Sequence, residues 1–159
     1  MIKVKSYANI AIVKYWGKKD AAKMIPATSS ISLTLNDMFT ETEMEFINDS
    51  DIKIAVEKEM KSGNCKDKFS DMTDLFYLNG ELQDSVHTEK ISKVVDLFRE
   101  NRDQKVKIST INNMPTAAGL SSSSSGLSAV IKACNELFEK NYTQSELAQI
   151  SKFGSGSSS

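Results

Sequence analysis

The sequence of 159 residues contains few of the residues that mark several common protein classes. Its two cysteines, Cys65 and Cys134, form neither a metal-ligand spacing nor a disulfide framework. The only histidine, His87, has no evident catalytic partner in the sequence, so we expect it to be solvated. No apolar stretch is long enough for a membrane span, and no signal peptide precedes the first strand-like segment. These absences argue against a disulfide scaffold or a membrane-spanning protein, and they favour the cytoplasm.

Neither positive nor negative charge predominates in the sequence. The formal net charge is −1, so the chain has neither the basic surface that nucleic acids require nor a polybasic patch for a membrane. The remaining composition, 40% hydrophobic and 26% charged, is ordinary for a globular protein. The length predicts one domain with a sizeable core.

Hydrophobic alternation predicts strands along much of the chain. The segments concerned are 3–13, 30–35, 40–46, 75–78 and 105–110. Asn79-Gly80 follows one of them and predicts a type I′ turn. We expect 14–29 to be a polar loop, and the charged segment 48–73 to be a surface excursion with one edge strand.

Helical spacing predicts three helices. One carries Ile91, Val94, Val95 and Phe98, with His87 in its first turn, and the next has an apolar stripe from Leu127 to Phe138 that includes Cys134. Thr143 and Glu146 form a capping box that opens the third. This order predicts an α+β fold with helices packed on one face of a sheet.

A run of small residues, Pro115-Thr-Ala-Ala-Gly-Leu-Ser-Ser-Ser-Ser-Ser-Gly126, lies between the last strand and the second helix. Small side chains let the backbone approach a ligand, and a helix N-terminus favours a phosphate. It is not a Walker A loop, because no Gly-Lys-Ser/Thr closes it. Serine runs are also typical of flexible linkers, but linkers are rarely enclosed by a periodic strand and a periodic helix.

The last residues, Gly154-Ser-Gly-Ser-Ser-Ser159, allow two interpretations. They have the composition of an expression linker, or they form a second small-residue loop that binds phosphate through N–H groups and hydroxyls. Composition does not choose between them.

Four segments, in this order, resemble mevalonate diphosphate decarboxylases. They are Asn9-Ile-Ala-Ile-Val-Lys-Tyr-Trp-Gly-Lys18, Pro26-Ala-Thr-Ser-Ser-Ile-Ser-Leu-Thr-Leu35, the serine run from Asn113 to Gly126, and Gly154-Ser-Gly-Ser157. The Pro-x-x-x-Gly-Leu-Ser-Ser loop marks the wider superfamily of galactokinase, homoserine kinase and mevalonate kinase. The segments around Lys18 and Ser155 are specific to the decarboxylases.

The resemblance implies ATP-dependent decarboxylation of mevalonate 5-diphosphate with Mg²⁺. Phosphorylation of the C3 hydroxyl makes it a good leaving group, and loss of phosphate with CO₂ gives isopentenyl diphosphate. Such a site needs dense anion stabilisation.

The resemblance also implies roles for individual residues. For ATP binding these are Pro115, Ala118, Gly119, Leu120, Ser121, Ser122 and Ser123, with Ser122 as the Mg²⁺ contact and Ser123 near the γ-phosphate. For substrate binding they are Tyr15, Trp16, Gly17, Lys18, Ser155, Gly156, Ser157 and Ser158, with Lys18 as the catalytic cation. By residue type alone Lys18 would be a solvated loop lysine, whereas Trp16 fits a core anchor and a pocket wall equally well.

The implied fold is a mixed, mostly antiparallel sheet with helices on one face, similar to a domain of ribosomal protein S5, with a left-handed βαβ crossover around the phosphate loop. In this reading residues 1–159 are the N-terminal ATP-binding domain, and a catalytic aspartate lies in a C-terminal domain that the chain lacks. We therefore expect the chain alone to be inactive and the whole enzyme to be a homodimer. One alternative is another small-molecule kinase of the superfamily. A second is an RNA-binding module, which the net charge of −1 disfavours.

Overall fold

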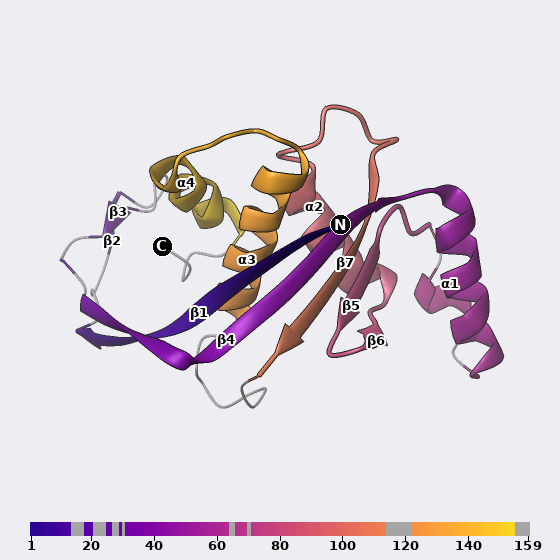
Figure 1. Ribbon diagram of the computed structural model, residues 1–159, viewed down its shortest axis with the longest axis horizontal. Helices are drawn as coiled ribbons and strands as arrows, with labels where there is room; N and C mark the ends of the chain where they lie inside the picture. Colours follow the sequence, from indigo (N-terminus) through magenta and orange to yellow (C-terminus); the bar gives the residue numbers. More distant parts are fainter. Residues whose placement is uncertain are drawn as a thin grey trace.

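The computed structural model describes residues 1–13, 18–20, 25–26, 29, 31–63, 66–69, 71–113 and 122–154. Their main feature is a five-stranded sheet with the strand order β1-β4-β7-β5-β6 (Figure 1). Its strands are β1 (Ile2–Val13), β4 (Ile31–Ile47), β7 (Lys105–Asn112), β5 (Leu75–Leu78) and β6 (Glu81–Leu82). A second, two-stranded sheet consists of β2 (Lys18–Asp20) and β3 (Ile25–Pro26).

Most neighbouring strands are antiparallel. β4 pairs antiparallel with β1 on one side and with β7 on the other, while β5 runs parallel to β7. β5 and β6 form a hairpin whose turn residues Asn79 and Gly80 have φ of 52° and 88°. Both angles are positive, as a type I′ turn requires, so the turn predicted from Asn79-Gly80 is confirmed.

The helices lie on both sides of this sheet, but unequally (Figure 1). They are α1 (Asp49–Lys61), the 3₁₀ turn η1 (Lys66–Phe69), α2 (Ser85–Val95), α3 (Ser122–Leu137) and α4 (Gln144–Gly154). Phe76 of β5 packs into the cluster beneath α2 and α3, whereas Leu75 and Tyr77 pack with Ile52 of α1. Because successive strand residues point to opposite faces, α1 covers the other face at the β5 edge, while α2 and α3 share the predicted face.

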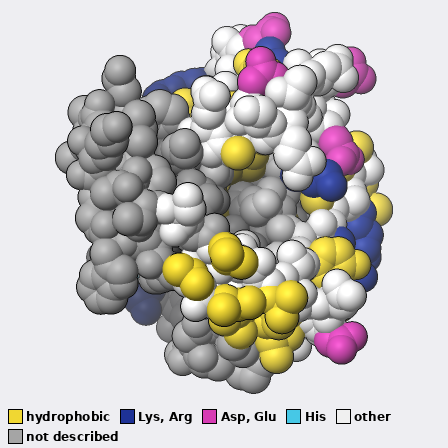
Figure 2. All heavy atoms as spheres, turned by 90° about the vertical axis from the view of Figure 1, so that its left-hand side faces the viewer, with side chains coloured by type: hydrophobic (Ala, Val, Ile, Leu, Met, Phe, Trp, Pro, Cys, Tyr) yellow, Lys and Arg dark blue, Asp and Glu magenta, His cyan; other side chains and the backbone are white. Residues whose placement is uncertain are grey.

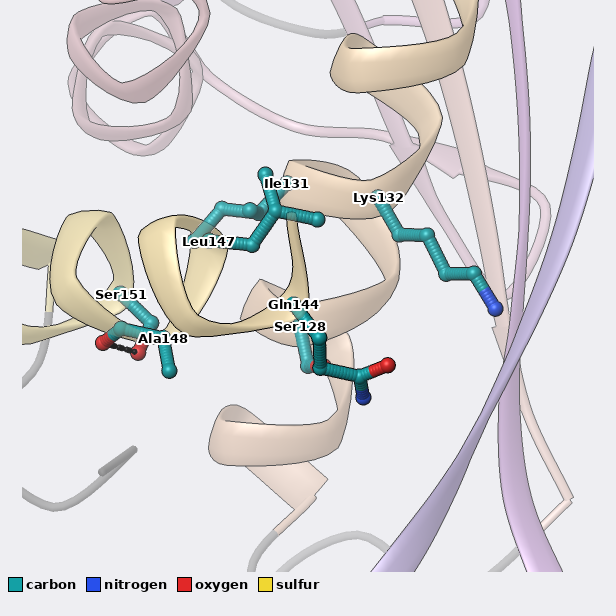
Figure 3. Close-up of a pocket in the computed structure, with 7 residues that line it drawn as sticks. All are labelled: Ser128, Ile131, Lys132, Gln144, Leu147, Ala148 and Ser151. Atoms are coloured by element: carbon teal, nitrogen blue, oxygen red, sulfur yellow. Dashed lines mark hydrogen bonds between the residues drawn. The ribbon is translucent and has the colours of Figure 1, made fainter. Parts of the chain in front are cut away.

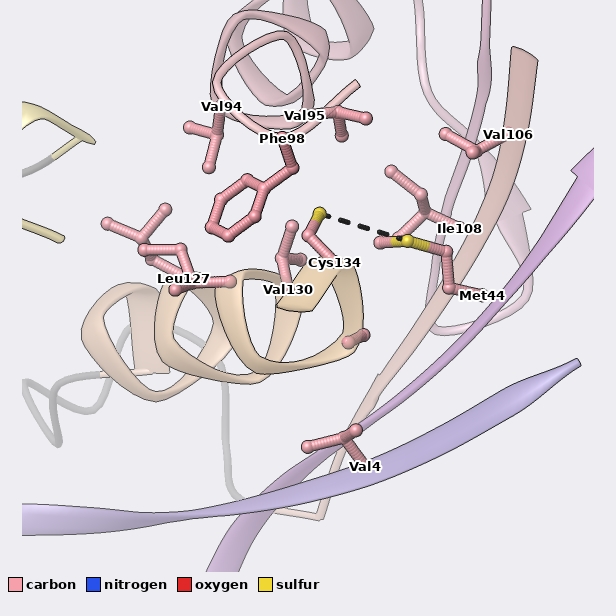
Figure 4. Close-up of a cluster of buried hydrophobic side chains, with 12 residues drawn as sticks. Val4, Met44, Val94, Val95, Phe98, Val106, Ile108, Leu127, Val130 and Cys134 are labelled. Carbon is pink, nitrogen blue, oxygen red and sulfur yellow. Dashed lines mark hydrogen bonds between the residues drawn. The ribbon is translucent and has the colours of Figure 1, made fainter. Parts of the chain in front are cut away.

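The main core lies between the sheet and α2 and α3 (Figure 4). Met44 and Ile108 project from the sheet toward Phe98, which follows α2, and toward Val130 of α3. The Cys134 thiol faces the Met44 sulfur at 3.9 Å. Burial raises the pKa of this thiol to about 12, so it stays protonated and apolar, as expected for a core cysteine.

A fully buried carboxylate, that of Asp74, joins three elements. It accepts hydrogen bonds from Ser92 Oγ of α2 at 2.6 Å and from the Val106 N–H of β7 at 2.9 Å. Arg99 Nη2 donates to it at 2.6 Å, and this guanidinium is only 3% exposed. Buried charges are tolerated when they are paired and hydrogen-bonded, and here both conditions hold.

The edge strand expected within 48–73 was wrong. Asn48 accepts hydrogen bonds from the N–H groups of Ser50 and Asp51, and Asp51 in turn accepts the Asn48 N–H. This reciprocal capping box starts helix α1 in place of an edge strand. Alternation of Ile52, Ile54 and Val56 indicated a strand, but only Ile52 is buried.

Two further expectations are corrected. The segments 31–35 and 40–46 belong to one strand of 17 residues, β4, because the register shift against β1 between Tyr7 and Ala8 absorbs residues 36–38. The expected loop 14–29 contains the short β2–β3 pair.

No helix in the described part of the chain has the length and apolarity needed to cross a membrane.

Candidate phosphate-binding site

The predicted strand, small-residue segment and helix occur in that order. β7 ends at Asn112 and α3 begins at Ser122, which confirms both flanks of the serine run. Residues 114–121 lie outside the described residues. They include five of the predicted ATP contacts: Pro115, Ala118, Gly119, Leu120 and Ser121. Ser122 and Ser123 form the first turn of α3.

The entry to this segment is held by the side chain of Asn113. Its Oδ1 accepts the N–H of Phe39 at 2.7 Å, and its Nδ2 donates to the Asp37 carbonyl at 2.8 Å. The Asn113 N–H also donates to the Phe39 carbonyl at 3.1 Å. Three hydrogen bonds to β4 therefore fix the chain at the point where it leaves the sheet.

The exit is held by two buried hydroxyls. Ser125 Oγ, in the first turn of α3, lies 2.8 Å from Thr40 Oγ1 of β4. Thr40 Oγ1 donates to Asn112 Oδ1 at 2.7 Å, and Thr40 is fully buried. The last residue of β7 and the first turn of α3 are thus joined through one threonine.

The start of α3 suits an anion. The first four N–H groups of a helix have no partner within it, and the helix dipole places partial positive charge there. The first turn of α3 contains no acidic residue. These features fit the phosphates of a nucleotide.

No cluster of three or more His, Cys, Asp or Glu in the described parts of the chain could hold a metal. Mg²⁺ is usually bound by one or two side chains together with substrate phosphates and water, so a serine beside a bound triphosphate is a suitable ligand set.

The other predicted site residues are only partly placed. The backbone of Lys18 lies in β2, opposite Pro26 of β3. Tyr15, Trp16 and Gly17 lie outside the described residues. α4 ends at Gly154, and Ser155, Gly156, Ser157 and Ser158 also lie outside them. Their roles stay predictions.

A small cavity of about 160 Å³ lies between α3 and α4 (Figure 3). Leu147 of α4 faces Ile131 of α3, and Ser151 Oγ donates to the Ala148 carbonyl at 2.8 Å. Ligand pockets usually enclose about 300–1,000 Å³. This cavity is too small for a nucleotide and is a packing gap between helices.

His87 is not part of this site. It lies in the first turn of α2, 58% exposed, with Nδ1 2.7 Å from Asp84 Oδ1. The hydrogen bonds from His87 lower the pKa of Asp84, which is the N-cap of α2. The expectation of a solvated first-turn residue is confirmed.

The end of the β1–β4 ribbon carries exposed apolar side chains. Figure 2 shows hydrophobic side chains gathered on the side of the molecule where β1 and β4 reach furthest from the other strands. The exposed residues of this part of the ribbon include Ile12 and Leu33, at 68% and 58% exposure.

Comparison with known proteins identifies the family. The model of the diphosphomevalonate decarboxylase-like N-terminal domain matches residues 6–75 and 65–159. The chain belongs to this family. Diphosphomevalonate decarboxylase of Schizosaccharomyces pombe is 34% identical over 97% of this chain, but the match covers 38% of that relative. The chain therefore spans about two fifths of the length of this curated relative.

Solved structures agree. Mevalonate pyrophosphate decarboxylase from Streptococcus pyogenes is 52% identical with a TM-score of 0.75, and the match covers 99% of this chain and 43% of that one. A structure described as MDDEF in complex with MVAPP, AMPPCP and magnesium is 34% identical with a TM-score of 0.69, with 98% and 42% covered. The α+β sheet fold of the decarboxylase-like domain is therefore shown, whereas the left-handed crossover around the phosphate loop stays a prediction.

The sequence analysis did not identify Thr40 at this candidate site. It was assigned only to a strand, and nothing in its sequence neighbourhood indicates contact with a helix 85 residues later.

Proposed function

We propose that this chain is the N-terminal, ATP-binding part of an ATP-dependent diphosphomevalonate decarboxylase. The observation that carries the proposal is the family match, which extends over nearly the whole chain. The structure adds support, because a helix N-terminus without acidic residues follows the strand and the serine run. The neighbour that holds magnesium, AMPPCP and MVAPP supports ATP, Mg²⁺ and mevalonate 5-diphosphate as ligands.

In the proposed reaction the C3 hydroxyl of mevalonate 5-diphosphate gives up its proton to a base, its oxygen attacks the γ-phosphorus of ATP, and ADP leaves. The C3–O bond then breaks with loss of phosphate, and the carboxylate leaves as CO₂. The electron pair of the C–C bond that joined the carboxylate to the chain forms the double bond of isopentenyl diphosphate. A tertiary hydroxyl is a poor leaving group, so phosphorylation must come first.

The chain's residues would serve this reaction by holding anions. Residues 115–123 would surround the ATP phosphates, with Ser122 at Mg²⁺ and Ser123 at the γ-phosphate. Lys18 would neutralise charge near the C3 oxygen, beside a pocket formed by Tyr15, Trp16 and Gly17. Residues 155–158 would hydrogen-bond the diphosphate or the carboxylate of the substrate.

The rest of the enzyme would supply what this chain lacks. The chain spans about two fifths of the relatives it matches. We infer that a second domain carries the catalytic aspartate, that the chain alone is inactive, and that the whole enzyme is a cytoplasmic homodimer.

The test uses the uninterrupted gene product that contains this chain. ADP and CO₂ are followed together with MgATP and mevalonate, its 5-phosphate or its 5-diphosphate. Matched ADP and CO₂ with the diphosphate alone is the expected result, and Lys18→Ala should abolish both. ADP without CO₂ would indicate a kinase of the same superfamily. Failure to form ADP with any of the three substrates would refute the proposal.

A further inference from the structure

Both ends of the segment 114–121 are tied to the same short stretch of β4. Asn113 bonds to Asp37 and Phe39 at the entry, and Ser125 bonds to Thr40 at the exit. The two attachment points on β4 are therefore consecutive in sequence. A substitution in this stretch of β4 would therefore disturb the positions of both Asn113 and Ser125.

Asn113 extends the sheet with a side chain. The β4–β7 ladder ends at the pair Thr40 and Asn112, one residue before Asn113. The Asn113 amide has one acceptor and a donor, like a peptide group, and it bonds the β4 backbone with both. Together with the Asn113 N–H, which donates to the Phe39 carbonyl at 3.1 Å, this amide holds the last described residue before the segment against β4.

Thr40 sets the distance between strand end and helix start. Its hydroxyl bonds to Asn112 on one side and faces Ser125 on the other, at 2.7 and 2.8 Å. Thr40 and Ser125 are 0% and 4% exposed, so water does not replace these bonds. Hydrogen bonds in such surroundings are strong and their loss is costly.

We propose that Thr40 and Asn113 are positioning residues for ATP: they fix the end of β7 and the first turn of α3 against β4, and so set the position of the helix N–H groups that would bind the triphosphate. The inference rests on the proposed function. Neither residue needs to touch the nucleotide. Misplacement of a binding group by about 1 Å can cost as much as a hundredfold in rate, so the effect should be measurable.

The chain contains a matched control. Thr42, two residues along β4 on the same face, pairs its hydroxyl with that of Thr110 of β7 at 3.0 Å, and both residues are buried. This pair joins the same two strands with the same chemistry, but it contacts neither Asn113 nor the first turn of α3 in any described hydrogen bond. Thr42→Val therefore reproduces the structural loss without the positioning loss.

The experiment measures the Kd of MgATP and of mevalonate 5-diphosphate for the uninterrupted gene product and its variants. Thr40→Val should raise the Kd of MgATP about tenfold and leave the Kd of the diphosphate unchanged. Thr40→Ser, which keeps the hydroxyl, should restore MgATP binding, and Thr42→Val should leave it at the wild-type value.

Asn113→Ala keeps the test decisive if Thr40→Val does not fold, because Asn113 is exposed and its loss removes two bonds at the entry. It should also weaken MgATP selectively. Equal weakening by Thr40→Val and Thr42→Val, or no effect of Asn113→Ala, would overturn the positioning role and leave the proposed function standing. A wild-type protein that binds no MgATP would overturn both.

Discussion

The half of the β1–β4 ribbon beneath α3 and the half that extends beyond it have the same backbone pairing but different surroundings. In the near half, Val4 and Met44 are buried against α3. In the far half, Ile10 pairs with Leu33 and Val13 with Ile31, and all four are exposed. Ala8 is buried and pairs with Leu35, so Leu33 lies on the side of the ribbon that faces the helices.

Length explains the difference. The 17 residues of β4 extend about 56 Å at 3.3 Å per residue. The 16 residues of α3 extend about 24 Å at 1.5 Å per residue. One helix cannot cover the whole strand, so alternation of apolar residues shows that a strand forms but not whether its apolar face is buried.

The largest test of this comparison removes one apolar side chain from each half. Met44→Ala should lower the free energy of unfolding by about 2–5 kcal/mol, because it leaves a cavity in a fully buried site. Leu33→Ala should change it by less than about 0.5 kcal/mol, since Leu33 is 58% exposed. Urea unfolding measures both, and similar losses would show that the far half is covered in solution.

A smaller effect should separate hydroxyls on the same strand. Thr42→Val leaves the buried Thr110 hydroxyl without its partner at 3.0 Å and should lower the free energy of unfolding by about 1 kcal/mol. Thr34→Val, in the exposed far half, should change it by less than about 0.5 kcal/mol. Thermal unfolding of the two variants gives the comparison, which fails if Thr34→Val costs as much as Thr42→Val.

The smallest effect concerns the charged face of the near half. Hydrogen bonds to Glu41 and then Glu43 raise the pKa of Lys3 above its ordinary value of 10.5. The protonated form therefore favours the folded state, fully below pH 10.5 and progressively less as the pH rises through the folded-state pKa. Lys3→Met should lose stability relative to wild type near neutral pH, and the difference should vanish at high pH. A difference that grows with pH would contradict this assignment.

Local signals predicted the elements that depend on local chemistry. The Asn79-Gly80 turn, the Thr143 capping box and the apolar stripe of α3 depend on residues close in sequence, and all three were predicted. α1 was missed although its Asn48 and Asp51 form a capping box, because alternating Ile52, Ile54 and Val56 favoured a strand.

The site was predictable only where one segment carries it. The serine run and its two flanks were identified from sequence spacing. The attachment of that run to Thr40 was not, because it joins residues far apart in the chain through side chains of common type. Long-range polar contacts leave no periodic signal.

The buried carboxylate of Asp74 also has a consequence for how the chain folds. Asp74, the residue before β5, bonds to Ser92 of α2, to Arg99 after α2 and to the Val106 N–H of β7, which lie 18, 25 and 32 residues away in sequence. If α2, the residues after it or β7 detached, the buried carboxylate would lose a hydrogen bond or its Arg99 ion pair. β5, α2 and β7 should therefore join and leave the native structure together, as one cooperative unit.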